Sequence, residues 1–295
     1  MKKIIPALMA AVALASCSPK ITEPMVMARE VPERMDDFIW ENDLICYRAY
    51  GKALEKETLS PGLDLWVKIP GKLVADKMYK DALQNGKSYH KNWGDGKDCY
   101  KVGKTLGAGA SVPMADGRFL FPKTNWRSSE IVSCTPEKVV FILHYPWWES
   151  EMGRFALDKK FTVVAGSCFC MVEDTYFYEG DAAGFTVAAG IARHNIDSES
   201  SAEGSLAIWE AASDQGAEPE DGMLGVAVIM PGAQDTGLTK DKKHSICSKT
   251  VKSGETLTYW IGSCWSKGSI KTKEEWFKAI DSFDAVRWKK AASKK

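Results

Sequence analysis

The sequence lacks the motifs of several large enzyme classes. It has no G-x-S-x-G elbow, no phosphate-cradling glycine loop and no H-E-x-x-H. Serine hydrolases, nucleotide enzymes and zincin proteases are therefore disfavoured. It also has no C-x-x-C pair and no close histidine spacing, which argues against a thiolate metal site. Histidine is scarce, with four in 295 residues.

The chain also lacks an excess of charge of either sign. Lysine and arginine number 39, and aspartate and glutamate also number 39. Loss of Lys2 and Lys3 with a leader would leave two more acidic than basic groups. A nucleic-acid partner needs a positive patch, so none is expected. Contact with a membrane is expected through a lipid alone.

The first residues predict export. Two lysines and the apolar run from Ile4 to Ala15 form a secretory signal that is too short to span a bilayer. The residues Leu14 to Cys17 resemble a bacterial lipobox, which predicts lipidation of Cys17; the alternative is a plain signal peptide. We predict an envelope lipoprotein of the outer membrane, on the periplasmic side because no acidic run follows Cys17. The predicted segments are a signal peptide at 1–16, a tether at 17–31 and one β-sandwich domain at 32–295.

Short apolar runs separated by glycine, proline and polar turns predict an all-β fold, an antiparallel β-sandwich. The end of the chain differs. Thr272 to Glu275 fits a capping box, and apolar residues follow it at helical spacing, which predicts a C-terminal helix closing over a sheet. The predicted strands are 43–50, 63–68, 138–145, 161–164, 168–177, 184–194, 205–211, 224–230, 244–251 and 257–264.

The cysteine pattern does not predict a full disulfide framework. Seven cysteines remain beside Cys17, an odd number for a long chain. Cys168 and Cys170 are two apart and cannot bond within one strand. Cys247 and Cys264 flank a predicted turn and are the one disulfide candidate.

The stretch SYHKNWGDGKDCYKVG, residues 88–103, holds the strongest candidate site. Its Trp93-Gly-Asp-Gly segment predicts a turn, followed by a strand with Asp98 and Tyr100 on one face and Lys101 on the other. With His90 returning across the turn, such a cluster would hold a sugar or move a proton. The alternative is a hydrogen-bonded turn.

A second polar stretch spans residues 34–43, and Arg48 follows in an apolar strand. The charges around Trp40, with Glu41 and Asp43 among them, would suit a saccharide or a cation. A buried salt-bridge cluster is the alternative, because buried charges in a sheet must be paired. No cofactor is predicted, although calcium would suit the acidic side chains of this stretch, Asp36, Asp37, Glu41 and Asp43.

Aromatic residues are abundant, with eleven tryptophans. Trp66, Trp93 and Trp126 lie near strand or loop ends, where indole rings stack on sugars, although core packing is the default for any one of them. His144 and His194 end strands and are predicted to be structural. His244 follows a lysine run and is predicted to be solvated.

Several motifs together resemble the family called domain of unknown function 4861, over residues 29 to 265. Its members look like secreted or lipid-anchored proteins of polysaccharide-degrading bacteria, found beside hydrolases that remove unsaturated uronic acids from pectin-like glycans. The resemblance implies a carbohydrate ligand and supplies no catalytic residue. By analogy, it implies a supersandwich like that of galactose mutarotases. The matching motifs are Arg34, DDFIWEND, RAYG, PGLDLWVK, Tyr79-Lys80, Tyr89-His90, GDGKDCYKVG, Gly107-Ala-Gly, Tyr145-Pro-Trp, Ala165-Gly-Ser and Thr186-Val-Ala-Ala-Gly-Ile.

The first hypothesis is an enzyme acting on uronate-containing oligosaccharides. In β-elimination, Arg48 or Lys101 would neutralise the sugar carboxylate and His90 with Tyr100 would move the proton. In hydrolysis, Asp98 would work with Asp43 or Glu41. A mutarotase or epimerase is a variant. The second hypothesis is a glycan-binding lipoprotein without catalysis, stacking sugars on Trp66, Trp93 and Trp126, and the third is a structural role in an envelope complex.

Overall fold

The computed structural model describes residues 23–57, 59–212 and 221–295. The predicted signal peptide, Cys17 and the first part of the predicted tether lie outside these residues. Within them, no helix is long and apolar enough to cross a membrane.

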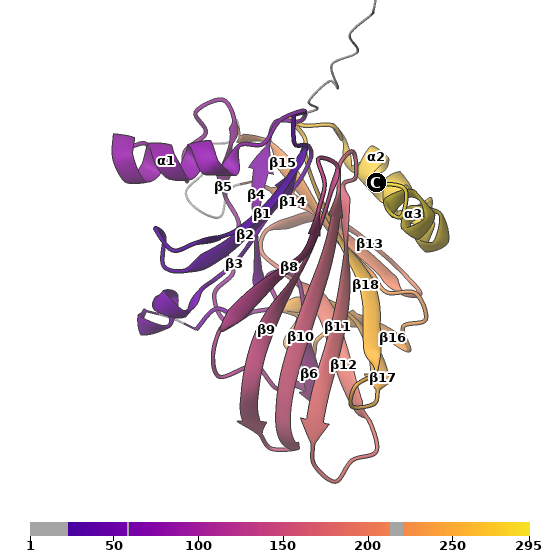
Figure 1. Cartoon of the computed structure of the whole chain (residues 1–295). Helices are drawn as coiled ribbons and strands as arrows, with labels where there is room; N and C mark the ends of the chain where they lie inside the picture. The colour runs from indigo at the N-terminus through magenta and orange to yellow at the C-terminus, as the bar shows by residue number, and fades with distance from the viewer. Residues whose placement is uncertain (1–22, 58, 213–220) are drawn as a thin grey trace, which may run out of the picture.

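The described chain forms three antiparallel sheets (Figure 1). The N-terminal sheet has the order β1-β2-β3-β4-β5, with strands Val26–Val31, Asp37–Asn42, Cys46–Ala49, Leu63–Lys68 and Gly96–Asp98. A second sheet has the order β16-β17-β12-β6-β7, with strands Asp235–Leu238, His244–Val251, Phe185–Ala192, Ala108–Ala115 and Arg118–Phe119. The long sheet has the order β13-β14-β15-β18-β11-β10-β9-β8, with strands Ile196–Ala202, Ser205–Ala211, Met223–Ile229, Thr256–Trp265, Phe169–Glu179, Gly153–Val164, Lys138–Ser150 and Ser128–Cys134.

The two five-stranded sheets pack on the long sheet and form a β-sandwich. Strands β2 and β4 contact β10 and β18, while β6, β12 and β17 contact β14, β15 and β18. The two smaller sheets meet where Leu63 bridges Gly107. One apolar core runs between the layers and includes Phe38, Phe141 and Val187, one from each sheet. The prediction of an antiparallel β-sandwich is confirmed.

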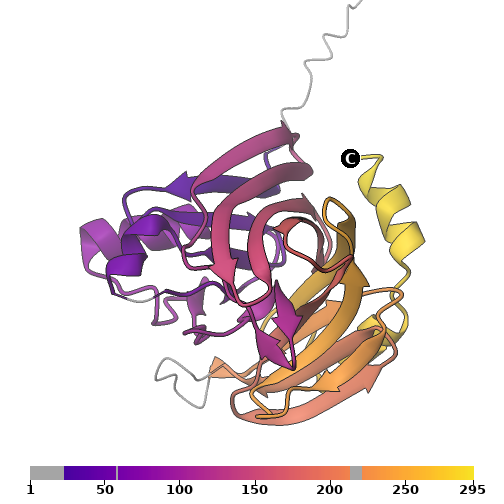
Figure 2. The same cartoon turned by 90° about the horizontal axis from the view of Figure 1, so that it is seen from below.

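Helices cover the outer faces on opposite sides of the molecule (Figures 1 and 2). Helix α1 (Ala75–Asn85) lies on the N-terminal sheet, and α2 (Lys273–Asp281) packs on β14 and β15 of the long sheet. One half of the predicted capping box is present, because the Thr272 side chain accepts a hydrogen bond from the Glu275 amide, while the Glu275 carboxylate accepts from the Lys271 amide and not from that of Thr272. A further helix, α3 (Ala285–Ala292), begins at a cap of its own, Asp284, so the predicted C-terminal helix is in fact two.

Strand β2 shows how the sequence builds the layers. Phe38 and Trp40 point into the sandwich core, and the alternate residues Asp37, Ile39 and Glu41 point toward α1. All six residues of the strand are buried. The N-terminal sheet is therefore covered on both faces, which places charged side chains in the interior.

The structure differs from the sequence predictions at several places, three of which concern the tether, the stretch after Trp93 and the disulfide. Strand β1 (Val26–Val31) pairs with β2 in the range predicted as tether, because Val26 and Val31 are buried in the domain. The strand predicted after Trp93 ends at Asp98. Cys247 and Cys264 are both free, because the Cys247 side chain packs in the core between the sheets, whereas the Cys264 side chain packs under α2 on the outer face of the long sheet. That disulfide prediction is wrong.

Candidate functional site

A cluster of buried charges lies on the face of the N-terminal sheet that carries α1. We call it the Arg48 cluster. Neighbouring strands bring its members together, since Ile39 of β2 pairs with Arg48, Arg48 pairs with Asp64, and Asp98 follows on β5. The cluster consists of Arg34, Asp37, Arg48, Asp64 and Asp98.

Arg48 occupies the centre of the cluster and is 1% exposed. One of its terminal nitrogens, Nη2, lies 2.5 Å from Oδ2 of Asp64 and 2.7 Å from Oδ2 of Asp98. Its other terminal nitrogen lies 3.7 Å from Asp37, which Arg34 also contacts at 3.1 Å. A guanidinium presents donors in a rigid fork, so it can hold several carboxylates at fixed angles.

The charges of the cluster do not balance. Three carboxylates face two guanidinium groups, so full ionisation would leave one excess negative charge in a buried place. Burial disfavours such a charge. Accordingly, burial raises the pKa of Asp64 to about 7, against the opposing effect of Arg48, and raises that of Asp37 to about 6. It also raises the pKa of Asp98. The raised pKa values therefore favour a proton on the cluster as the pH falls below neutrality.

His90 connects this cluster to the surface. Its side chain is 40% exposed, and Nδ1 lies 3.6 Å from Oδ2 of Asp98 and 3.3 Å from the Asp98 backbone oxygen. A carbonyl oxygen only accepts, so Nδ1 must carry the hydrogen. Burial lowers the pKa of His90, which favours the neutral ring. The neutral ring then presents Nε2 as an unprotonated base.

The loop around His90 is fixed by its own hydrogen bonds. The Asp98 amide donates to the Tyr89 carbonyl at 2.9 Å, and Asn92 Oδ1 accepts from the Gly94 amide at 2.8 Å. Gly96 has a φ of 132°, and a Cβ there would lie 2.0 Å from a backbone oxygen of β4. Only glycine fits this approach, so the turn prediction for this stretch holds.

Aromatic rings enclose the buried arginine. Its guanidinium lies 4.8 Å from the Tyr50 ring centre, 5.2 Å from Trp66 and 5.7 Å from Tyr89. Tyr89 stacks on Trp66 and meets the His90 ring edge-on at 4.6 Å. Its hydroxyl accepts a hydrogen bond from Arg34 Nε at 3.1 Å. Cation–π contacts of this kind hold a desolvated cation in place.

The turn that carries Arg34 is strained. Met35 and Asp36 both have positive φ, at 51° and 57°, which is uncommon for residues with a side chain. Gly51 packs against this turn so closely that a Cβ on it would lie 1.7 Å from the Asp36 carbonyl oxygen. The turn is therefore held by the fold around it.

Two residues predicted beside His90 lie elsewhere. Tyr100 is 1% exposed and donates to the carbonyl oxygens of Gly107 and Ala192. Lys101 is exposed, and its carbonyl oxygen contacts His194 at 2.8 Å. Because the strand ends at Asp98, the alternation that would have aligned Tyr100 with Asp98 does not continue.

Two of the predicted catalytic carboxylates have structural roles. Glu41 is fully buried and pairs with Lys68 at 2.6 Å. It also accepts hydrogen bonds from the backbone amides of Val74 and Ala75 at the start of α1. A carboxylate there suits the positive end of the helix dipole. Asp43 accepts from the Gly166 amide at 2.6 Å. Among the residues that the structure describes, no group of three or more His, Cys, Asp or Glu is arranged to hold a metal ion.

Of Trp40 and the three predicted stacking tryptophans, only Trp93 is available at the surface. Trp40, Trp66 and Trp126 are 0%, 1% and 5% exposed, so they are core residues. Trp93 is 49% exposed, on the same loop as His90. The ammonium groups of Lys91 and Lys87 lie 4.8 and 5.9 Å from its ring centre.

The other histidines differ from His90 in their surroundings. His144 is half-exposed and pairs with Asp158 at 2.6 Å on the outer face of the long sheet. His194 contacts Glu210 at 3.1 Å. His244 was predicted to be solvated, but it is 5% exposed and its Nε2 accepts from the Leu106 amide. That prediction is wrong, because His244 begins a strand that pairs with β12.

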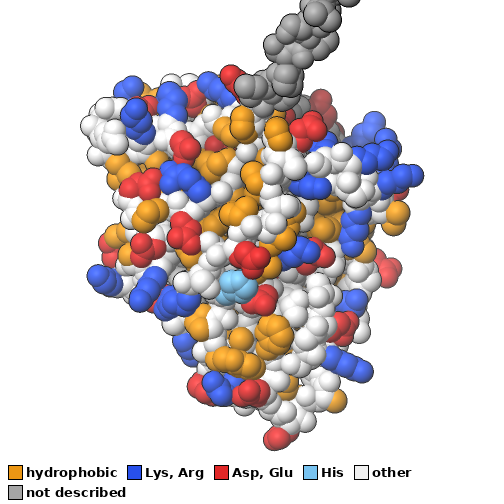
Figure 3. Space-filling model, viewed as in Figure 1, with side chains coloured by type: hydrophobic (Ala, Val, Ile, Leu, Met, Phe, Trp, Pro, Cys, Tyr) orange, Lys and Arg blue, Asp and Glu red, His pale blue; other side chains and the backbone are white. Residues whose placement is uncertain are grey.

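The surface itself carries charges of both signs. Figure 3 shows acidic and basic side chains interspersed over one face, with lysine and arginine gathered near the C-terminal helices. The shallow dent beside Trp93 is lined by three lysines, Lys77, Lys87 and Lys91, and by two aspartates, Asp81 and Asp95, which both pair with Lys77.

Asp64 was missed as a functional candidate, whereas Arg34, Tyr89 and Lys91 lie within the two predicted stretches, residues 34–43 and 88–103, without having been assigned a role of their own. A signal existed for Asp64, which is one of two charged residues, with Lys68, in the otherwise apolar strand LDLWVK and lies beside Arg48 of the preceding strand. Buried charges of opposite sign on adjacent strands are expected to pair, because burying either one alone carries a large desolvation penalty.

Fold and site together define a β-sandwich protein with a partly exposed histidine set against a buried charge cluster in which carboxylates outnumber guanidinium groups. The chain belongs to the family described as Domain of unknown function (DUF4861), whose model matches residues 12–288. A relative, the "Uncharacterized protein P7" of Formosa agariphila, is 27% identical over 276 residues. The match covers 87% of this chain and 66% of the relative, so the chain spans just under two thirds of that protein.

Solved structures show a more distant similarity. The GH36 α-galactosidase AgaB of Geobacillus stearothermophilus has a TM-score of 0.39 and 8% identity, over 82% of this chain and 41% of that one. A variant of AgaA from the same organism, in complex with raffinose, has a TM-score of 0.36 and 7% identity, over 78% and 40% of the two chains. The matched region is less than half of each enzyme.

Proposed function

We propose that this protein is a carbohydrate-active enzyme that cleaves uronate-containing, pectin-like oligosaccharides by β-elimination. One observation carries the proposal. His90 is the single side chain of the predicted catalytic set, within the described residues, that is both partly exposed and in contact with the Arg48 cluster. Its neutral ring presents Nε2 to the surface as a base.

The reaction follows from the groups on this loop. The sugar ring stacks on Trp93, and Lys91 beside it faces the carboxylate, which makes the adjacent C–H more acidic. Nε2 of His90 takes that proton, the C–H electrons form the ring double bond, and the bond to the leaving oxygen breaks. Tyr89 donates a proton to that oxygen, since its hydroxyl accepts from Arg34 and retains its own hydrogen. Arg48 is buried and positions Asp98; it does not touch the substrate.

Hydrolysis has less support. It needs an acid and a second carboxylate flanking the scissile bond. Asp98 is 1% exposed, Glu41 is buried at the start of α1, and Asp43 binds a loop amide. These three carboxylates are not gathered at an open surface. A sugar epimerase would share the proton-removal step with elimination and is distinguished by its products.

The cellular address remains part of the proposal. Lipidation of Cys17, attachment to the outer membrane and the periplasmic side are predictions from the leader sequence. A glycan-binding lipoprotein without catalysis is the second candidate, and the exposed pair of Trp93 and Lys91 favours it.

The test is incubation with pectin-derived and other uronate oligosaccharides, followed by mass spectrometry and by absorbance of the unsaturated uronate. Elimination conserves total mass and creates the absorbing group, whereas hydrolysis adds water. We expect His90→Gln to lower turnover by about a hundredfold or more while binding persists. The matched control is His144→Gln, since His144 has a similar exposed fraction, 35% against 40%.

Two outcomes would contradict the enzyme proposal. If no substrate changes while binding persists and Trp93→Ala abolishes it, the protein is a glycan binder. If turnover occurs but survives His90→Gln, the base lies elsewhere.

A further inference from the structure

A second hollow lies away from the His90 loop. It is formed by β7, the segment that follows it, the turn between β9 and β10, and two loops that contribute Leu59 and Lys104. Its volume is about 270 Å³. In Figure 1 the turn between β9 and β10 lies at the lower end of the molecule, whereas α1 lies at the upper end.

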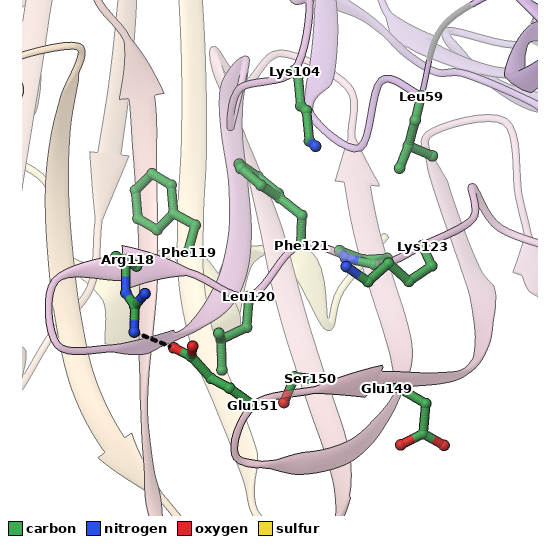
Figure 4. Close-up of a pocket in the computed structure, with 11 residues that line it drawn as sticks. Leu59, Lys104, Arg118, Phe119, Leu120, Phe121, Lys123, Glu149, Ser150 and Glu151 are labelled. Atoms are coloured by element: carbon green, nitrogen blue, oxygen red, sulfur yellow. Dashed lines mark hydrogen bonds and ion pairs between the residues drawn. The ribbon is translucent and has the colours of Figure 1, made fainter.

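The hollow combines charges of both signs with an aromatic wall. Its two carboxylates are each paired with an arginine, Glu151 with Arg118 and Glu149 with Arg154. Lys104 and Lys123 reach into it from different loops, with Phe121 between them (Figure 4). Phe121 meets Phe119 edge-on at 5.4 Å, which fixes the wall.

The two lysines differ from Arg118 at the same rim. Arg118 is paired with Glu151 at 2.8 Å. Lys104 and Lys123 are exposed and make no ion pair with any residue that the structure describes. Two unpaired ammonium groups facing one hollow repel each other, and a bound anion relieves that repulsion.

We propose that this hollow is a second, non-catalytic site that binds a carboxylate-bearing sugar ring. The carboxylate lies between Lys104 and Lys123, and the apolar face of the ring packs on Phe121. The volume is near the lower limit of small-molecule pockets, so the site takes one or two rings and not a long chain. This site is separate from the His90 loop and does not depend on catalysis there.

The experiment measures galacturonate binding by calorimetry in the Trp93→Ala variant, which removes the stacking surface of the His90 loop. Lys104→Gln with Lys123→Gln should weaken binding roughly tenfold, equivalent to about 1.4 kcal/mol. The matched control is Lys252→Gln with Lys271→Gln, two exposed lysines elsewhere. Phe121→Ala should weaken binding by a further few-fold, and added salt should weaken it in the parent but not in the lysine double variant.

Three results would overturn the proposal. The first is no galacturonate binding in the Trp93→Ala protein, and the second is equal binding by the two lysine double variants. The third is a combined result: inorganic sulfate displaces galacturonate at equal concentration, and Phe121→Ala leaves galacturonate binding unchanged. That result would identify a plain anion site. Activity at His90 is measured separately, so failure here leaves the elimination proposal intact.

Discussion

The charge imbalance of the Arg48 cluster predicts that replacing Asp64 by asparagine will change how stability depends on pH. The wild-type cluster has three carboxylates and two guanidinium groups, and the variant has two of each. The folded wild type should therefore hold a proton that the folded variant does not need.

The sign and size of this pH dependence of stability follow from the pKa of Asp64. Its folded value of about 7 lies above the ordinary 3.8, so the folded state binds more protons than the unfolded state between these values. Stability from this group is complete below pH 3.8 and is lost as pH rises toward 7. At 1.36 kcal/mol per unit, the loss between pH 5 and pH 8 is about 3 kcal/mol.

The assay is urea unfolding followed by tryptophan fluorescence at pH 5, 6, 7 and 8. The difference between the wild type and Asp64→Asn is the quantity of interest, because His244 is common to both proteins and cancels. His90 does not cancel completely: Asp64 raises its pKa, so the variant lowers that pKa further and gains stability with rising pH in the same direction as the predicted effect. His90 and His244 have lowered pKa values, so their contributions rise with pH and would mask the effect in the wild type alone. The difference should move by about 3 kcal/mol in favour of the variant from pH 5 to pH 8.

The control is Asp181→Asn, an exposed aspartate, whose difference from wild type should stay flat. A flat difference for Asp64→Asn as well would refute the reasoning, because it would mean that Arg48 keeps all three carboxylates ionised. A shift toward the wild type with rising pH would refute it more strongly.

The remaining predictions concern residues that hold the N-terminal sheet and the Arg34 turn in place. Glu41→Gln should lower the free energy of unfolding by about 3 kcal/mol, because it leaves the charge of Lys68 buried and unpaired. Its control, Glu33→Gln at an exposed ion pair, should lower it by less than about 1 kcal/mol in the same urea assay. Gly51→Ala should cost about 3 kcal/mol and reduce turnover, because its Cβ would lie 1.7 Å from a backbone oxygen of the Arg34 turn; Gly237→Ala, which has open space, is the comparison, and equal stability of the two would contradict the close approach.

The sequence predicted the layered fold because most strands carry apolar residues with period two between glycine and polar turns. Leu63–Lys68, Ser205–Ala211 and His244–Val251 have the predicted boundaries. Helix α1 was missed, although Ala75, Met78 and Tyr79 are buried at helical spacing. Its length of 11 residues and its polar face gave a weak signal beside the stronger strand pattern.

The site was only partly predictable for a related reason. His90 and Asp98 are eight residues apart and meet across a turn, which local sequence can indicate. Whether Trp66 stacks on a sugar or on Tyr89 depends on α1 and the loop above it, which cover that face of the sheet. Single-sequence patterns give the direction of a side chain within a strand but not what covers it.

Burying the Arg48 cluster carries a large desolvation free energy, which a purely structural role does not require. A buried ion cluster is often less stabilising than apolar residues of the same volume. Here three buried carboxylates outnumber two guanidinium groups, and burial raises the pKa values of Asp37 and Asp64. The cluster contacts the partly exposed His90 through Asp98. The Glu41 and Lys68 pair on the same sheet is balanced and caps a helix, which is what a structural pair requires. The unbalanced cluster instead keeps the Asp98 backbone oxygen in place to accept from Nδ1 of His90, and so fixes the tautomer that leaves Nε2 free. If the cluster served stability alone, Asp64→Asn would stabilise the protein at pH 8 and leave turnover unchanged. If the cluster positions His90, Asp64→Asn should also stabilise the protein at pH 8 but should in addition shift the pH profile of turnover.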